Sequence, residues 1–280
     1  MATRAFIVGI ERYADPRNNL IGVSRDVSST VGILNTFGIS DLEVIKDENA
    51  KKQSIETGLG NLLKQTGPGD VAVFYYSGHG VMLTAEDTGS ADPDGQDEAL
   101  VPFECDTGNL IVDNKIKEAL DKNLNPGAFF YGIYDCCHSG DIQKNLLLGS
   151  LSNVMRHGMS SAEVQKSVTV DQLIFTGRPS GRAGPSLVAQ AQTSKKLIVD
   201  DSRVNAVHIA ACEPENTALV LNIDGERRSV FTWALEQVLR PETTVSALEI
   251  ALTAKQATKT RHHKPFVTCH STQRGRNVLR

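Results

Sequence analysis

The chain has 280 residues, of which 40% are hydrophobic and 22% are charged, and these ordinary proportions allow a sizeable core. The formal net charge is −4, and the sequence contains no dense lysine or arginine run, which argues against binding to nucleic acid. No stretch approaches the ~20 apolar residues of a membrane span. The first apolar run, residues 5–10, is too short for a signal peptide. We therefore expect a cytoplasmic protein that binds neither nucleic acid nor membrane.

The cysteines favour reduced thiols over a disulfide framework or a zinc site. Their number is odd, and no pair has the CxxC spacing of a zinc ribbon or a thioredoxin motif. They are Cys105, Cys136, Cys137, Cys212 and Cys269.

Strand-like and helix-like segments alternate along the chain, which is typical of an α/β sheet. Strands are predicted at 4–10, 41–47, 70–78, 127–135, 204–212 and 264–271, and a short extended segment at 99–105. Helices are predicted at 23–38, between Asn49 and Pro68, and at 112–124, 229–239 and 244–260, with Asn49 and Asp113 as N-caps. The run at 70–78 is continuously apolar, which predicts a strand covered on both faces.

Domain organisation follows from a change of composition in the middle of the chain. Residues 141–202 are rich in small and polar side chains and are weakly patterned, as in exposed, mobile segments. We predict a single domain over 1–280, with a larger part (1–150), a flexible loop (151–202) and a smaller part (203–280).

Two predicted strands end in reactive side chains. His79 follows the strand at 70–77, and Cys137 follows the strand at 127–135. Because functional groups gather at the carboxyl ends of parallel strands, neighbouring strands would bring this thiol and this imidazole to one edge. The flanking Gly78 and Gly80 permit tight turns, and backbone N–H groups near Gly78 and Cys137 are candidates for an oxyanion hole. The sequence thus predicts a cysteine–histidine catalytic pair.

The segments "YYSGHG" and "DCCHSG" resemble the catalytic motifs of the caspase-like clan, and most closely those of metacaspases. Their separation is similar to the ~50 residues between the caspase histidine and cysteine. The likeness extends over most of the chain through "AFIVGIERY", "NLIGVSRD", "DGQDEALVPFE", "VHIAACEPENTA" and "SVFTWAL". The resemblance implies a three-layer α/β sandwich in which helices flank a mostly parallel central sheet. It also implies a cysteine endopeptidase of peptidase family C14.

The resemblance assigns roles to individual residues. Cys137, which precedes "HSG", matches the nucleophile, and His79 matches the general base. Cys136 occupies a position where the family tolerates several small residues, so we expect it to serve packing. His138 is a rival imidazole, but a neighbour in sequence is poorly placed for an in-line contact.

Three further residues match the family's S1 pocket. Asp26, Ser77 and Asp135 would form an anionic slot for an arginine or lysine at P1 of a protein substrate. Carboxylates pair with guanidinium groups through charge-assisted, bidentate hydrogen bonds. The alternatives are a surface helix residue for Asp26 and a turn cap for Asp135.

Calcium is a further possibility that the sequence leaves open. The loop at 84–98 carries hard oxygen ligands of the kind that Ca²⁺ prefers, namely Asp92, Asp94, Asp97 and Glu98. The family's metal site resembles a pair of acids at a helix start, here Asp113–Asn114, plus an acid after the nucleophile, here a displaced Asp141. This set is depleted, so a solvated acidic loop explains the composition equally well. Our candidate ligands are Asp94, Asp97 and Asp113.

Metacaspases often cleave themselves between their two parts, and here the candidate cleavage sites are Arg178, Arg182, Lys195 and Lys196. The first predicted strand begins at residue 4, so no prodomain is expected, and the resemblance implies a monomer. Two other hypotheses stay open. One is a weakly active or inactive caspase-like interaction module, and the other is a thiol redox protein that uses Cys136 and Cys137.

Overall fold

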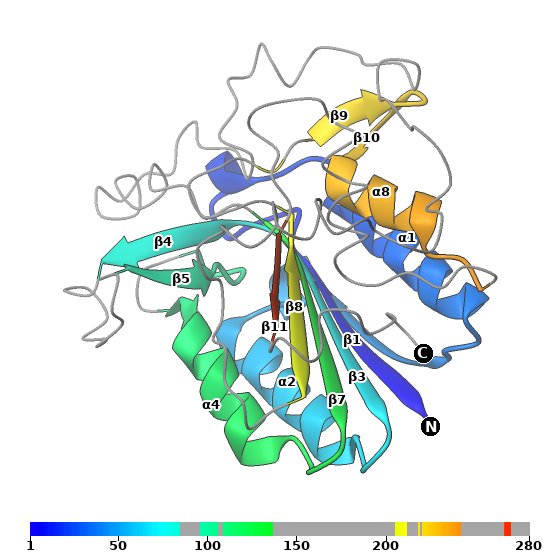
Figure 1. Cartoon of the computed structure of the whole chain (residues 1–280). Helices are drawn as coiled ribbons and strands as arrows, with labels where there is room; N and C mark the ends of the chain where they lie inside the picture. The colour runs from blue at the N-terminus through cyan, green and yellow to red at the C-terminus, as the bar shows by residue number, and fades with distance from the viewer. Residues whose placement is uncertain are drawn as a thin grey trace, which may run out of the picture.

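A computed structural model describes residues 1–84, 96–105, 109–136, 205–211, 218, 220–241 and 266–269. Its centre is a six-stranded sheet in the order β11-β8-β7-β3-β1-β2 (Figure 1). The strands are β1 (Thr3–Gly9), β2 (Asp41–Lys46), β3 (Val71–Ser77), β7 (Phe129–Asp135), β8 (Ala206–Ala210) and β11 (Phe266–Cys269). Five of them are parallel, and β11 pairs antiparallel with β8.

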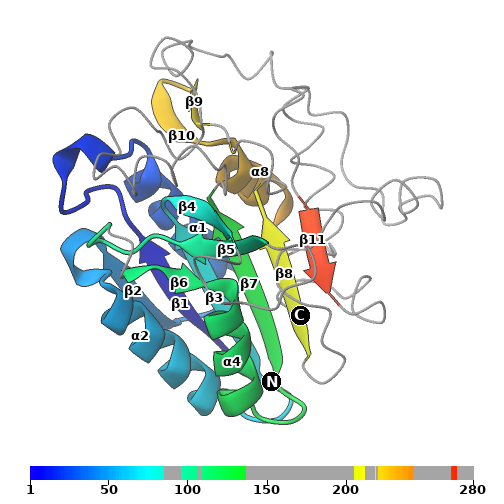
Figure 2. The same ribbon diagram turned by 90° about the vertical axis from the view of Figure 1, so that its left-hand side faces the viewer.

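Helices cover both faces of this sheet. Helices α1 (Val23–Thr36) and α8 (Val230–Val238) lie on one face, and α2 (Lys52–Gln65) and α4 (Asp113–Asn123) lie on the other (Figure 2). The α/β class and the mostly parallel, helix-flanked sheet predicted from the sequence are thereby confirmed. In the part of the chain that the structure describes, no helix has the length and apolar content to cross a membrane.

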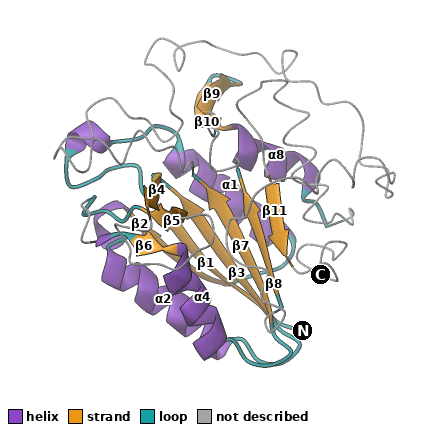
Figure 3. Ribbon diagram, turned by 60° about the vertical axis from the view of Figure 1, so that its left-hand side comes forward, coloured by secondary structure: helices purple, strands orange, loops and turns teal. Residues whose placement is uncertain are grey.

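Smaller elements lie beyond the carboxyl ends of the central strands (Figure 3). A three-stranded antiparallel sheet has the order β4 (Gly80–Thr84), β5 (Gln96–Leu100) and β6 (Ile111–Val112). A hairpin joins β9 (Val220–Ile223) to β10 (Glu226–Ser229). Two 3-10 turns, η1 (Pro16–Asn18) and η2 (Asp47–Asn49), follow β1 and β2.

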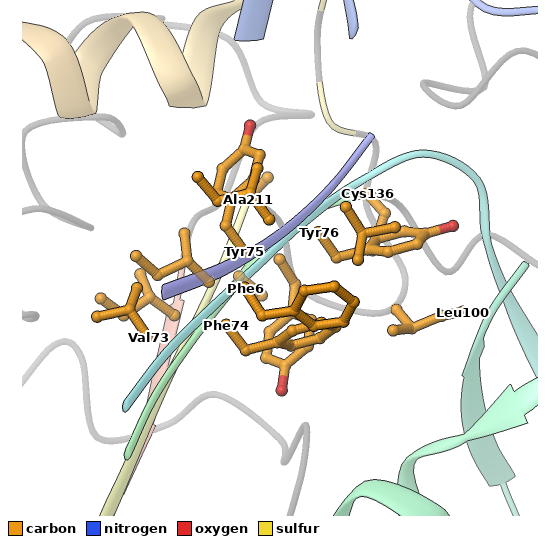
Figure 4. Packing of buried hydrophobic residues seen from close by; sticks show 14 of the residues in the cluster. Phe6, Val73, Phe74, Tyr75, Tyr76, Leu100, Cys136 and Ala211 are labelled. Carbon is orange, nitrogen blue, oxygen red and sulfur yellow. The ribbon is translucent and has the colours of Figure 1, made fainter. Parts of the chain in front are cut away.

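The core is densest around β3. Every residue of this strand is buried, as predicted from its continuous apolar run. Alternation along the strand sends Phe74 toward the α2 and α4 side, where its ring centroid lies 5.9 Å from that of Phe6 (Figure 4). Tyr75 points to the opposite face, where its hydroxyl contacts Thr232 of α8. Burial of each such aromatic side chain contributes roughly 1.5–3 kcal/mol.

Several local predictions need correction. Asn49 does not cap α2, because it belongs to η2 and the N-cap residue is Lys51. Asp113 is the first residue of α4 and not its N-cap, which is Val112. The expected loop at 84–98 overlaps two strands, since β4 includes Thr84 and β5 begins at Gln96. The predicted helix at 244–260 and the loop at 151–202 lie outside the described residues.

The β9–β10 hairpin was not predicted, although the sequence carries its signal. Asp224 and Gly225 both adopt positive φ, at 54° and 84°, as a two-residue type I′ turn requires. An Asp-Gly pair between two strands is typical of this turn.

Close packing of α2 on β1 makes Gly58 sensitive to substitution. A Cβ atom there would lie 2.3–2.8 Å from atoms of the Phe6 ring, whereas no described atom lies within 4 Å of a Cβ at Gly60. We expect Gly58→Ala to destabilise the fold by about 1–3 kcal/mol through overpacking. Gly60→Ala should stabilise it by about 0.5–1 kcal/mol through helix propensity. Urea unfolding of both variants measures the difference, and equal effects would contradict this packing.

The buried His208 of β8 predicts a loss of stability in acid. Burial lowers its pKa from 6.5 to about 3. Between these values the unfolded chain binds a proton that the folded chain rejects, so stability is complete above pH 6.5 and decreases as the pH falls. The free energy of unfolding, measured with urea, should fall between pH 7 and pH 5 by about 2 kcal/mol less in His208→Gln than in the native chain. An identical loss in both proteins would contradict the assignment.

Candidate active site

The candidate site lies where polar side chains follow the carboxyl ends of β1, β3 and β7. Strands β3 and β7 are direct neighbours, and Ser77 is paired with Asp135 in their parallel register. The strand order places β1 and β3 at a topological switch point, since β2 lies on one side of β1 and the later strands lie on the other. Open α/β sheets bind their ligands at this position.

His79 stands two residues beyond β3 and is buried, with 1% of its surface exposed. Its backbone N–H donates to the Tyr13 hydroxyl at 2.7 Å, and its carbonyl accepts from the Tyr76 hydroxyl at 2.8 Å. The same carbonyl accepts from the Val101 N–H at 3.1 Å. The ring centroids of Tyr13 and His79 are 4.8 Å apart. The backbone of His79 is therefore held from both sides.

The imidazole of His79 has a defined tautomer. Its Nε2 lies 2.9 Å from the backbone carbonyl oxygen of Asn18. A carbonyl only accepts hydrogen bonds, so Nε2 must carry a hydrogen. In the neutral ring Nδ1 then carries the lone pair, which is the form that a general base needs.

The two tyrosines around His79 also explain the glycine that precedes it. A Cβ atom at Gly78 would lie 2.6 Å from the Tyr76 hydroxyl and 3.0 Å from that of Tyr13. Burial, with contributions from Tyr13 and the Cys136 thiol, raises the pKa of Tyr76 well above its usual value. The Tyr76 phenol thus stays protonated and keeps its hydrogen for the carbonyl groups of His79 and Val101.

The three predicted S1 residues come together on the α1 and α8 face of the sheet. Asp26 and Asp135 are both fully buried. Ser229 joins them, because its N–H donates to Asp26 Oδ1 at 2.9 Å and its hydroxyl donates to Asp135 Oδ1 at 2.8 Å. The Ser77 hydroxyl lies 3.5 Å from Asp26 Oδ2. Neither carboxylate is the exposed helix residue or simple turn cap of the alternative interpretation.

Sequence reasoning missed the contribution of α8 to this cluster. Thr232 donates to Asp135 Oδ2 at 2.5 Å and lies 2.7 Å from the Tyr75 hydroxyl. Ser229 also caps α8 by accepting from the Phe231 N–H at 3.2 Å. A serine just before an apolar helix is a recognisable N-cap signal. Nothing in the sequence, however, indicates that the same side chain bridges two carboxylates.

Other predicted residues stay predictions. Cys137 directly follows the last described residue of its segment, Cys136, which is packed in the core as expected. Cys137, Asp94 and the candidate cleavage sites Arg178, Arg182, Lys195 and Lys196 lie outside the described residues. Gly80 opens β4.

The structure describes two of the three candidate calcium ligands. Only the backbone of Asp97, in β5, is described. Asp113 is buried and accepts from the Asn114 N–H at 2.8 Å. Over the described residues, no three His, Cys, Asp or Glu side chains are grouped as a metal site would need.

The helix-flanked central sheet, with polar side chains beyond the carboxyl ends of β1, β3 and β7, defines the class of protein as caspase-like α/β. A sequence model of the metacaspase, peptidase C14 domain matches residues 3–145, so the chain belongs to the metacaspase family. It is 24% identical over 290 residues to metacaspase-1 of Lodderomyces elongisporus, a match that covers 95% of this chain and 64% of the relative.

The fold is shared with solved structures, among them two that match nearly the whole of this chain. One is a protein of Geobacter sulfurreducens, with a TM-score of 0.63 at 20% identity over 99% of this chain and 98% of that one. The other is caspase-1 of Spodoptera frugiperda, with a TM-score of 0.53 at 14% identity over 98% and 88% of the two chains.

The buried hydroxyl of Thr232 predicts a specific loss of stability. Thr232→Val keeps the shape of the side chain but leaves Asp135 Oδ2 and the Tyr75 hydroxyl without this partner, which should cost about 1–3 kcal/mol. Thr30→Val is the matched control, because the buried Thr30 hydroxyl donates to the Asp26 carbonyl of its own helix, and its loss should cost much less. Urea unfolding compares the two variants, and equal costs would argue against the cluster.

Proposed function

We propose that the chain is a cysteine endopeptidase that cleaves protein substrates after arginine or lysine, with Cys137 and His79 as its catalytic dyad. The observation that carries the proposal is the hydrogen bond from His79 Nε2 to the Asn18 carbonyl, which leaves the lone pair on Nδ1. Family membership supports the peptidase class. The pairing of β3 with β7 supports the dyad, because Cys137 comes two residues after the end of the neighbouring strand.

The proposed reaction follows from these positions. Nδ1 of His79 takes the proton of the Cys137 thiol, and the thiolate attacks the carbonyl carbon of the scissile bond. Backbone N–H groups near Gly78, Gly80 and Cys137 bind the oxyanion. The imidazolium then gives its proton to the leaving amine. Water, deprotonated by the same imidazole, hydrolyses the acyl-enzyme and restores the thiol.

The preference for a basic P1 residue is supported by the carboxylates of Asp26 and Asp135. The hydrogen bonds that Ser77, Ser229 and Thr232 provide come from neutral groups, and they orient the two carboxylates. A guanidinium or ammonium group would neutralise this charge, whereas an acidic P1 side chain would be repelled.

We also propose that the chain cleaves itself in the loop at 151–202. Residues from both sides of this loop share one sheet through the parallel pairing of β7 with β8. Cleavage there would therefore leave the two parts associated.

The function is tested with fluorogenic peptides that end in Arg, Lys or Asp, with and without Ca²⁺. We expect turnover of the Arg and Lys peptides only, and a loss of about 10²–10⁴-fold or more in His79→Ala and Cys137→Ala. Cys136→Ala is the matched control and should keep activity within a few fold. Sequencing of new N-termini reports self-cleavage and its P1 residue.

Each result bears on a different part of the proposal. A native chain no faster than Cys137→Ala would contradict the enzyme and favour an interaction module. Loss of activity in Cys136→Ala alone would point to thiol redox chemistry. Turnover of the Asp peptide alone would refute the basic S1 pocket.

A further inference from the structure

The mechanism leaves unused the buried carboxylate of Asp47, which directly follows β2. We propose that Asp47 is a positioning residue for His79 and that it acts through the loop at 11–20. The inference rests on the proposed role of His79 as general base. No sequence motif indicates this role, because it depends on contacts between Asp47 and the loop at 11–20, which follows a different strand, β1.

Asp47 binds the start of this loop with both of its carboxylate oxygens. Its Oδ1 accepts from the backbone N–H groups of Glu11 and Arg12, both at 2.9 Å. Its Oδ2 accepts from Arg12 Nε at 3.0 Å and pairs with Arg12 Nη2 at 3.0 Å. Hydrogen bonds to an ionised acceptor are about twice as strong as neutral ones, so this is a firm anchor.

The anchored residues lead directly to His79. Tyr13 follows Arg12, and its hydroxyl and ring are the groups that contact the His79 backbone and imidazole. The Tyr13 N–H in turn donates to Asn19 Oδ1 at 2.9 Å. A shift of Glu11 and Arg12 would therefore move Tyr13 against the catalytic ring.

The other end of the loop carries the second partner of the imidazole. The Asn18 carbonyl accepts from Nε2, and the Leu20 N–H donates to the Glu11 carbonyl at 2.8 Å, which joins the two ends of the loop. The Tyr13 ring and the Asn18 carbonyl, which contact the His79 imidazole, thus belong to one loop whose ends are joined, and Asp47 binds that loop from outside.

The backbone conformation of Asp47 is also unusual. Its φ is 49°, in the left-handed region that few residues other than glycine, asparagine and aspartate adopt readily. Such conformations cluster at functional sites. This geometry also determines the test, since Asp47→Gly removes the carboxylate without adding backbone strain and Asp47→Asn keeps an acceptor oxygen.

The first experiment measures kcat and KM of the full chain on an Arg-terminated peptide. Asp47→Gly should lower kcat by about 10- to 100-fold, because a displacement of about 1 Å suffices for such a loss, and should leave KM within about twofold. Asp47→Asn should recover most of the activity. Glu48→Ala is the matched control, since Glu48 is in the same turn, is exposed and lies 3.9 Å from Arg12 Nη2; it should match the native chain.

The second experiment separates positioning from general loss of stability. The rate of iodoacetamide alkylation of Cys137 is measured against pH, with Cys137→Ala as the blank for the other thiols. A nearby imidazolium lowers the pKa of a thiol below its usual 8.5. Asp47→Gly should therefore shift the midpoint of the alkylation curve upward by about one unit toward 8.5. Ile33→Val, which removes a buried methyl group in the last turns of α1, should lower the thermal midpoint without this shift.

The outcomes distinguish this inference from the function on which it rests. A native chain without turnover and with an ordinary Cys137 midpoint would refute the proposed dyad itself. An active native chain in which Asp47→Gly keeps its kcat and its midpoint would overturn the role of Asp47 alone. A loss of kcat in Asp47→Gly with an unchanged midpoint would likewise overturn it, since the His79 imidazolium would then still lower the pKa of the Cys137 thiol as in the native chain.

Discussion

The parallel pairing of β3 with β7 determines where this molecule can do chemistry. Seven residues of each strand are in register, from Val71 opposite Phe129 to Ser77 opposite Asp135. Apart from the partly buried Phe129, the strands are buried along this length, so hydrogen bonds and apolar packing fix their position relative to one another. Whatever follows Ser77 and Asp135 must therefore begin at the same edge of the sheet. A slip of one residue would exchange the faces of every side chain and separate Asp135 from Asp26.

The site beyond this edge is organised mainly by buried hydrogen bonds. His79 is enclosed, so its ring and backbone need partners that replace water, and the loop at 11–20 provides them through Tyr13 and the Asn18 carbonyl. Satisfied polar groups in a buried site have few alternative arrangements. The same contacts that compensate for burial also define the tautomer of the imidazole. Stability and the proposed catalytic geometry thus depend on one set of hydrogen bonds.

The sequence predicted the parts of this structure that a side-chain pattern can encode. Continuous apolar runs identified β3 and β7, and His79 lies just beyond β3 as predicted. It could not predict the Asn18 carbonyl as the partner of His79, because every residue has a carbonyl and only the fold selects one. The sequence also could not predict that Ser229 and Thr232 donate to Asp135, since hydroxyl side chains in a helical segment are more often caps or surface groups. The Asp-Gly turn between β9 and β10, by contrast, carried a local signal that was overlooked.

Helix α8 joins the two parts of the chain at the point where specificity is proposed. Asp26 and Asp135 precede the segment at 137–204, whereas Ser229 and Thr232 follow it, and their hydrogen bonds are completely buried. Removing α8 would leave two carboxylates in an apolar setting without these donors, which is costly for ionised groups. The acidic cluster can therefore keep its geometry only while both parts remain packed together. Separation of the two parts would thus also disrupt the proposed P1 pocket.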